Sequence, residues 1–251
     1  MICAINPSIY SEFQKLSLLF RTAIPFPHVV IDNFLDESVA EGLLKDFPKV
    51  SLMHRSHHYL FANKYELCSW NSNATCFGCL QDELLSKQFA SFVSKMSGKT
   101  LFMDSSCYLD IHQGLNGSFL DMHTDFTLHP YHSNWIHQLN VMIYLNKNWK
   151  QEYGGYLRLK GNLNETITEI APLFNRCVIM LSNDVTYHGY NRMILPKDVT
   201  RKSILANFYE EESFNMTPKK PTTWVPEKTL FKSRVAKLYN PVAVMKKRFF
   251  G

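Results

Sequence analysis

Residues 139–145 read Leu-Asn-Val-Met-Ile-Tyr-Leu, a short apolar run of the length and composition typical of a β-strand. Such runs recur after residue 100, with turn signals between them, at 101–111, 156–159, 166–170, 177–181 and 203–209. Short strands at this spacing predict a β-sandwich or a jelly roll that closes on itself. We therefore expect a fold that is mainly β from residue 101 onward, with flanking helices.

The first hundred residues carry helical patterns and one short strand instead. Helices are expected at 8–21, 36–47 and 82–96, and a strand at 27–32. Asp36 stands where a side-chain cap would begin the second of these helices. The chain is therefore divided into three parts: an N-terminal mixed and helical support region at 1–100, a β core at 101–212 and a C-terminal extension at 213–251.

The composition limits the class of protein. Of its 251 residues, 45% are hydrophobic and 20% are charged, which predicts a globular chain rather than a disordered one. The formal net charge of +5 is only mildly basic, so no nucleic-acid partner is expected. No apolar run approaches the ~20 residues of a membrane-spanning helix, so no membrane partner is expected either. The N-terminus lacks the pattern of a secretory signal, and the six cysteines are irregularly spaced, which predicts reduced thiols and a cytoplasmic location.

The first sign of chemistry is the triplet His123-Thr124-Asp125. Residues two apart on a strand point to the same face, so an imidazole and a carboxylate would be presented together. Such a pair suits one metal ion. The triplet alone is a weak signal, because short motifs often match by chance.

A second histidine, His188, follows 63 residues beyond Asp125, after several further predicted strands. In a closed sandwich, this distance is enough to bring the chain back beside the strand of His123. Two histidines and one carboxylate on one side of a metal leave its other positions open, an arrangement that suits non-haem Fe(II). A structural zinc site would instead be closed by four ligands.

The third sign is the run Arg201-Lys202-Ser203, which opens another predicted strand. Arg201 and Ser203 would share one face of that strand. A guanidinium beside a hydroxyl can hold a carboxylate through charge-assisted, forked hydrogen bonds. The order and spacing therefore predict a metal site followed by a carboxylate-binding site on the next strand.

Residues 25–211 resemble the Fe(II)/2-oxoglutarate-dependent dioxygenases, in their prolyl 4-hydroxylase-like branch. The segments that carry the resemblance are 26–35, 123–125, 143–149, 154–158, 188–189 and 201–203. The resemblance implies a double-stranded β-helix, or jelly-roll, core. It also implies that His123, Asp125 and His188 bind Fe(II) and act in catalysis, and that Arg201 binds the distal carboxylate of 2-oxoglutarate.

The same resemblance implies further contacts to the co-substrate. Tyr144 falls where the family places a tyrosine that hydrogen-bonds the distal carboxylate, and Ser203 would support it. Tyr144 is equally compatible with a place in the core. The family often has another tyrosine facing the co-substrate, and either Tyr108 or His112 could fill that role.

The implied reaction is hydroxylation of a C–H bond, with O2 consumed, succinate and CO2 released, and ascorbate as a supporting reductant. The first substrate we expect is a prolyl residue of a peptide or protein, and the alternative is a free amino acid or small metabolite. Two other classes stay open: a non-catalytic jelly-roll binding module, and a cupin-like metalloenzyme that does not use 2-oxoglutarate. The sequence predicts no oligomeric state.

Two loops are candidates for setting substrate specificity, at 51–79 and 126–137. The first contains His54, His57, Cys76 and Cys79, which leaves open whether they bind a second metal ion. A zinc site would need four convergent ligands, and the C-x-x-C pair has no matching second pair.

Overall fold

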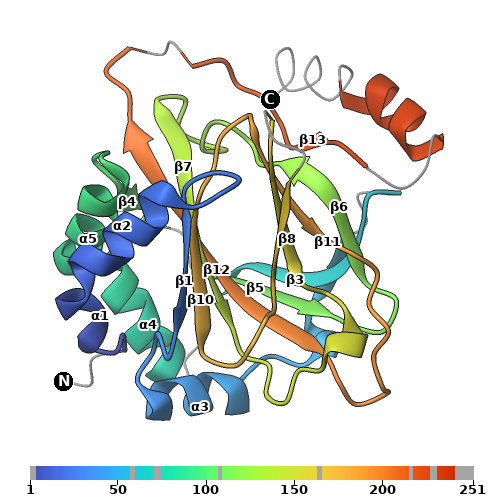
Figure 1. The fold of residues 1–251 in the computed structure, drawn as a ribbon, viewed down its shortest axis with the longest axis horizontal. Coiled ribbons are helices and arrows are strands. Elements are labelled where there is room, and N and C mark those ends of the chain that lie inside the picture. Colours follow the sequence, from blue (N-terminus) through green and yellow to red (C-terminus); the bar gives the residue numbers. More distant parts are fainter. Residues whose placement is uncertain are drawn as a thin grey trace.

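An antiparallel β-sheet that curls on itself forms the centre of the protein (Figure 1). The structure is a computed structural model, and it describes residues 4–56, 60–70, 75–106, 109–162, 166–214, 217–226 and 231–240. The strands are β1 (His28–Asp32), β2 (His54–Ser56), β3 (Ala62–Trp70), β4 (Phe102–Met103), β5 (Leu109–Gly114), β6 (Phe119–Thr124), β7 (Trp135–Tyr144), β8 (Leu157–Gly161), β9 (Ile167–Ile170), β10 (Arg176–Leu181), β11 (Thr186–Tyr190), β12 (Arg201–Glu211) and β13 (Thr223–Trp224).

The sheet has two halves that are joined by one long strand. The larger half has the strand order β1-β10-β7-β12-β5-β3, and the smaller half continues as β6-β11-β8-β9. Strand β3 pairs with β5 on one side and with β6 on the other, so the two halves share it. This arrangement confirms the predicted jelly-roll core with flanking helices.

Alternating residues of the central strands serve two different cores. Ile143 of β7 and Cys177 of β10 pack into the cluster that contains the N-terminal helices. Their neighbours Tyr144 and Val178 pack into a second cluster, with Leu157 of β8. Both faces of these strands are therefore buried, which explains why the sequence is a continuous apolar run rather than an alternating one.

Helices cover the outer face of the larger half, as Figure 1 shows beside β1, β10, β7 and β12. They are α1 (Ser8–Ser11), α2 (Phe13–Thr22), α3 (Glu37–Lys45), α4 (Thr75–Leu85) and α5 (Lys87–Ser97), and residues 231–240 are also helical. The helix that was predicted at 82–96 is in fact two helices. The Ser86 hydroxyl accepts a hydrogen bond from the amide of Phe89 and so begins α5. In the part of the chain that the structure describes, no helix has the length and apolarity needed to span a membrane.

The three-part division of the chain follows changes in secondary structure, but the sheet crosses its boundaries. Strands β1 and β3 come from the segment 1–100 and pair with strands of the segment 101–212, while β2 pairs with β3. Strand β13, from the segment 213–251, pairs with β6. Both outer segments therefore contribute strands to the same sheet.

One buried amide attaches the N-terminal segment to the sheet. Asn175 precedes β10, and its side chain donates to the backbone oxygen of Leu35 (2.9 Å) and accepts from the backbone amide of Leu35 (2.8 Å). Asn175 is buried and has a left-handed backbone, with φ of 56°. Its side chain therefore takes the place of a neighbouring strand for Leu35.

We expect Asn175→Ala to lower the free energy of unfolding by about 2–4 kcal/mol, because both backbone groups of Leu35 would lose their partner in a buried place. Urea unfolding, followed by circular dichroism, measures the change. Asn33→Ala is the matched control, since Asn33 also has a left-handed backbone, with φ of 52°, but is exposed. Its cost should be about 1 kcal/mol, from backbone strain alone. Equal losses in the two variants would contradict the role given to the Asn175 amide.

Candidate active site

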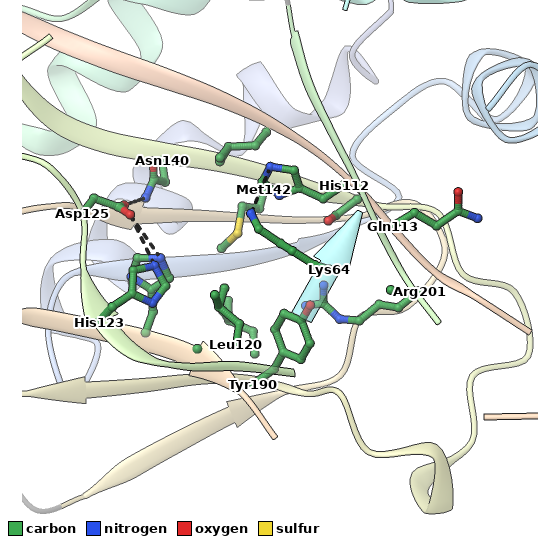
Figure 2. A pocket seen from close by; sticks show the side chains of 16 residues that line it. Lys64, His112, Gln113, Leu120, His123, Asp125, Asn140, Met142, Tyr190 and Arg201 are labelled. Atoms are coloured by element: carbon green, nitrogen blue, oxygen red, sulfur yellow. Dashed lines mark hydrogen bonds and ion pairs between the residues drawn. The ribbon is translucent and has the colours of Figure 1, made fainter. Parts of the chain in front are cut away.

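A cavity between the two halves of the sheet collects side chains from β3, β5, β6, β7, β11 and β12 (Figure 2). Three predicted metal ligands meet at its wall. His123 lies on β6 and Asp125 directly follows that strand, while His188 of β11 lies opposite His123 in the register of the two strands. The fold thus brings His188 to the other two residues across 63 positions of sequence.

The ligand atoms of these three residues face a common point. Nε2 of His123 lies 3.5 Å from Oδ1 of Asp125, and Nε2 of His188 lies 3.7 Å from the same oxygen. All three ligand atoms lie within 4.8 Å of one another. Two atoms held about 2.1 Å from one ion at right angles are about 3.0 Å apart, so a contraction of less than about 1 Å brings each histidine–aspartate pair to the spacing of a divalent-cation site.

The protonation states also suit a metal. Nδ1 of His123 donates to the backbone oxygen of Asp121 over 3.0 Å, which leaves Nε2 as a free lone pair. Burial lowers the pKa of His188 to about 3, so its imidazole is neutral. Burial alone would raise the pKa of Asp125, but the charge that His188 carries when it is protonated at low pH holds that pKa well below its usual range, so Asp125 is ionised where His188 is neutral. A neutral imidazole and an ionised carboxylate are the forms that bind a divalent cation.

The second oxygen of Asp125 is held by two side chains that the sequence analysis did not single out. Oδ2 accepts a hydrogen bond from the Asn140 amide over 2.7 Å and a longer one from the Ser182 hydroxyl over 3.4 Å. His137, which is buried, contacts both of these partners in turn. The network turns Oδ1 toward the two histidines. In the sequence, Asn140 could have been noticed as a polar residue inside the apolar run 139–145.

Arg201 begins β12 and is buried in the same cavity, with only 6% of its surface exposed. Its Nε donates to the backbone oxygen of Gly155 over 2.8 Å, and its Nη2 donates to the Tyr144 hydroxyl over 3.3 Å. The guanidinium also lies 4.4 Å from the ring centre of Tyr190. Among the described residues, no carboxylate forms an ion pair with Arg201. A buried cation of this kind requires an anion, which a carboxylate ligand would supply.

The turn before β8 approaches Arg201 closely because Gly155 has no side chain. The backbone φ of Gly155 is 66°, a value that other residues rarely adopt. A Cβ at this position would lie 2.4 Å from the sulfur of Met193 and 3.3 Å from Cδ of Arg201. Gly155 thus allows its own carbonyl oxygen to fix the orientation of the guanidinium.

The structure places the other predicted co-substrate residues as follows. Ser203 and His112 line the cavity. Tyr144 is not among the residues that line it: its hydroxyl lies behind Arg201 and also approaches the sulfur of Met142 at 3.8 Å. Tyr108 lies outside the described residues. The contacts of all four with a co-substrate stay predictions.

Tyr190 lines the cavity beside Arg201 and was missed. It follows His188 by two positions on β11, so the strand period alone could have placed both on the wall of one site.

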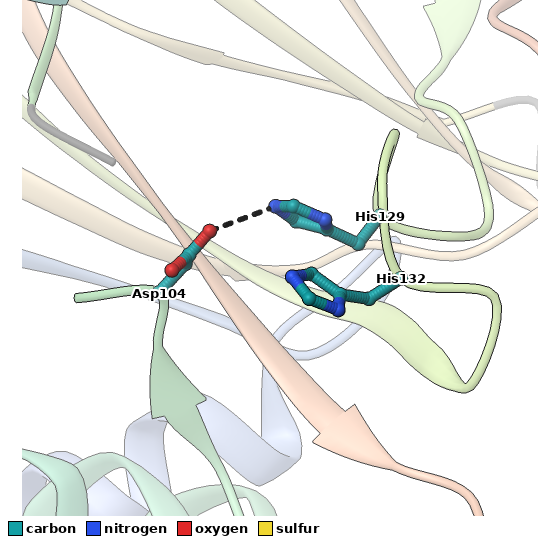
Figure 3. A group of neighbouring side chains, drawn as sticks. All are labelled: Asp104, His129 and His132. Atoms are coloured by element: carbon teal, nitrogen blue, oxygen red, sulfur yellow. Dashed lines mark ion pairs between the residues drawn. The ribbon is translucent and has the colours of Figure 1, made fainter. Parts of the chain in front are cut away.

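A second group of side chains that could hold a metal ion joins Asp104, which follows β4, to His129 and His132 on the loop after β6 (Figure 3). Nε2 of His129 lies 3.1 Å from Oδ2 of Asp104. The backbone amide of Tyr131 donates to Nδ1 of His129, so the proton of this neutral imidazole is on Nε2 and is donated to Asp104. In His123, by contrast, Nδ1 carries the proton and Nε2 faces the carboxylate. We therefore interpret the Asp104–His129 contact as a hydrogen bond that fixes the loop, not as a metal site.

The cysteine and histidine candidates for a second metal site are not brought together in the described part of the chain. His54, Cys76 and Cys79 belong to no group of three converging ligands there. His57 lies outside the described residues, so the question of a second metal at these positions stays open.

Comparison with known proteins agrees with this geometry. Residues 105–209 match the family model of the 2OG-Fe(II) oxygenase superfamily, and this range contains the three predicted metal ligands and Arg201. A search of curated protein sequences found no match.

Similar solved structures include a prolyl hydroxylase from Trichoplax adhaerens, which is 15% identical, with a TM-score of 0.59 over 81% of this chain and 91% of that one. A prolyl-4-hydroxylase from Pseudomonas putida is 13% identical, with a TM-score of 0.59 over 80% of this chain and 100% of that one. A prolyl 4-hydroxylase from Phytophthora capsici is 18% identical, with a TM-score of 0.58 over 95% and 78%. Such identities show a shared fold. The match over residues 105–209 and the prolyl-hydroxylase-like fold therefore indicate a 2-oxoglutarate-dependent enzyme that uses Fe(II), 2-oxoglutarate and O2.

Proposed function

We propose that this enzyme hydroxylates an unactivated C–H bond while it converts 2-oxoglutarate to succinate and CO2. One oxygen atom of O2 enters the hydroxyl group of the product and the other enters succinate. The observation that carries the proposal is a single cavity with three converging candidate metal ligands in one wall and, in another, the buried Arg201, which forms no ion pair with a described carboxylate (Figure 2).

The residues of the chain have separate tasks in this reaction. His123, Asp125 and His188 would hold Fe(II) from one side and leave its remaining positions for ligands. Bound Fe(II) and 2-oxoglutarate supply the oxidative chemistry, while the protein positions and shields them. Arg201 binds the distal carboxylate of the co-substrate, and Gly155 and Tyr144 keep the guanidinium in place for it.

The substrate we propose first is a prolyl residue of a peptide or protein. The Trichoplax adhaerens prolyl hydroxylase was solved in complex with a peptide fragment of the hypoxia inducible factor oxygen degradation domain, which supports a peptide in this fold. In this chain, a second cavity of about 320 Å³ shares Leu205 with the first and is lined by Phe126, Tyr131 and Tyr209. An extended substrate could therefore continue from the metal toward the loop 126–137. A free amino acid remains the alternative, and the cytoplasmic location stays a prediction.

The first prediction concerns the reaction itself. In air with Fe(II), 2-oxoglutarate and ascorbate, the wild-type protein should form succinate, and addition of a proline-containing peptide that is a substrate should increase the rate. His188→Ala should form none, because a metal ligand is lost, and an anaerobic sample should form none either. Succinate is measured by mass spectrometry. Succinate formation by the variant at the wild-type rate would contradict the proposed site.

The second prediction concerns the co-substrate. Arg201→Ala should raise the concentration of 2-oxoglutarate needed for half-maximal turnover, because a buried carboxylate would lose a charged partner worth about 2–5 kcal/mol. The control is Arg21→Ala, since the hydrogen bonds described for Arg21 go to backbone oxygens of helix α5, outside the cavity. An unchanged 2-oxoglutarate requirement in Arg201→Ala would show that Arg201 binds something else.

The third prediction concerns the orientation of Asp125. Asn140→Ala should weaken metal binding about 10–100-fold, the range found when a partner of a metal ligand is removed. Titration of the protein with Mn(II), followed by electron paramagnetic resonance of the free ion, measures this directly. Asn207→Ala is the matched control, because Asn207 pairs with Asn140 across β12 and β7 but makes no described contact with Asp125. Equal metal affinities in the two variants would overturn the positioning role of Asn140.

A further inference from the structure

Lys64 on β3 lines the same cavity as the metal ligands and Arg201, and no sequence motif singled it out. Its side chain is only 13% exposed. In Figure 2, the Lys64 side chain lies between those of Asp125 and Arg201. The cavity therefore contains a second cationic group.

The register of the strands places this second cation nearer the metal ligands than the first. Arg201 pairs with Gly114 of β5, and Lys64 lies beside the same position on the other edge of that strand. From this level Lys64 extends toward His112, which pairs with Ser203, one pleat along β12. Asn207 lies further along β12 in the same direction, and it pairs with Asn140. Asn140 in turn donates a hydrogen bond to Asp125, a predicted metal ligand. The ammonium therefore stands between the guanidinium and the metal site.

The ammonium group of Lys64 has one hydrogen-bond donor to spare. Nζ lies 2.9 Å from Oε2 of Glu66 and 3.4 Å from Nε2 of His112. Burial, with the charge of Lys64 as the second cause, lowers the pKa of His112 to about 3, so this imidazole is neutral and its Nε2 accepts. An ammonium has three N–H groups, and the third has no partner among the described residues.

Glu66 compensates the charge of Lys64 from behind, since it is not among the residues that line the cavity. The spare donor belongs to an ammonium that lines the cavity together with the three predicted metal ligands and Arg201. An anionic ligand atom is the partner that fits such a position, because charge-assisted hydrogen bonds are the strongest that a buried ammonium can form.

We propose that Lys64 is a further co-substrate-binding residue, whose ammonium contacts the keto-acid end of 2-oxoglutarate while Arg201 contacts the distal carboxylate. This inference rests on the proposed function, because it takes 2-oxoglutarate as the ligand of the cavity. Lys64 would then orient the half of the co-substrate that lies against the metal, from the strand that joins the two halves of the sheet.

Two keto acids separate the two ends of the ligand. 2-Oxoglutarate has both carboxylates, and 2-oxovalerate has the same carbon chain without the distal one. Their affinities for the Mn(II)-loaded protein are measured by calorimetry without O2. Lys64→Met should weaken both acids by the same factor, about 10–100-fold, the range of one charge-assisted hydrogen bond. Arg201→Met should weaken 2-oxoglutarate only.

The matched control is Lys99→Met, which removes another half-buried lysine–glutamate pair, Lys99–Glu210, outside the cavity. Its affinities for both acids should equal those of the wild-type protein. Lys64→Arg keeps the positive charge and should recover most of the affinity. If Lys64→Met proves unstable, the comparison of Lys64→Arg with Lys64→Gln gives the same test.

The outcomes distinguish the inference from the proposed function. Unchanged affinities for both acids in Lys64→Met would overturn the role of Lys64 alone. Weakening of 2-oxoglutarate without weakening of 2-oxovalerate would also overturn it, because Lys64 would then act at the distal carboxylate. If the wild-type protein binds neither acid, the proposed function itself falls, and the Lys64 assignment falls with it.

Discussion

The register between β6 and β11 is the constraint on which the site depends. It sets His188 opposite His123, and Asp125 lies two residues after His123, directly after the end of β6. Gly189 makes the close approach possible, since a Cβ there would lie 2.6 Å from the backbone oxygen of Leu120. A slip of one residue in this pairing would turn one imidazole to the outside. The closure of the sheet through β3 and the packing of the helices support this single pairing.

Sequence patterns were sufficient for the core strands, because β7 and β10 are apolar on both faces and β8 alternates apolar and polar residues. The runs at 139–145, 156–159, 166–170, 177–181 and 203–209 correspond to β7, β8, β9, β10 and β12. The convergence of His123, Asp125 and His188 could be predicted, because metal binding requires specific residue types at strand spacing. Asp36 was a recognisable helix cap for the same reason, and its carboxylate accepts from the amide of Ser38. Such features are local, so a short stretch of sequence contains the whole signal.

The features that were missed depend on contacts between distant segments. Strand β3 has mixed polar and apolar residues, because one part pairs with β5 and another with β6. Asn140 matters only because Asp125 returns to lie beside it, and Lys64 only because the sheet curls until β3 faces the cavity. The single helix expected at 82–96 failed for a local reason: Ser86 offers its hydroxyl to a new first turn, which favours a break.

The division of each central strand between two cores has a consequence for how this protein can change during evolution. On β7, the residues at odd positions, such as Ile143, support the helices, whereas even ones, such as Asn140 and Met142, face the chamber. Neighbouring residues of the strand are therefore under different selective pressures. Drift at odd positions is limited by folding, and drift at even positions by which molecule is bound. Substitutions at the cavity-facing positions of one strand can thus change the specificity without disturbing the packing of that strand against the helices.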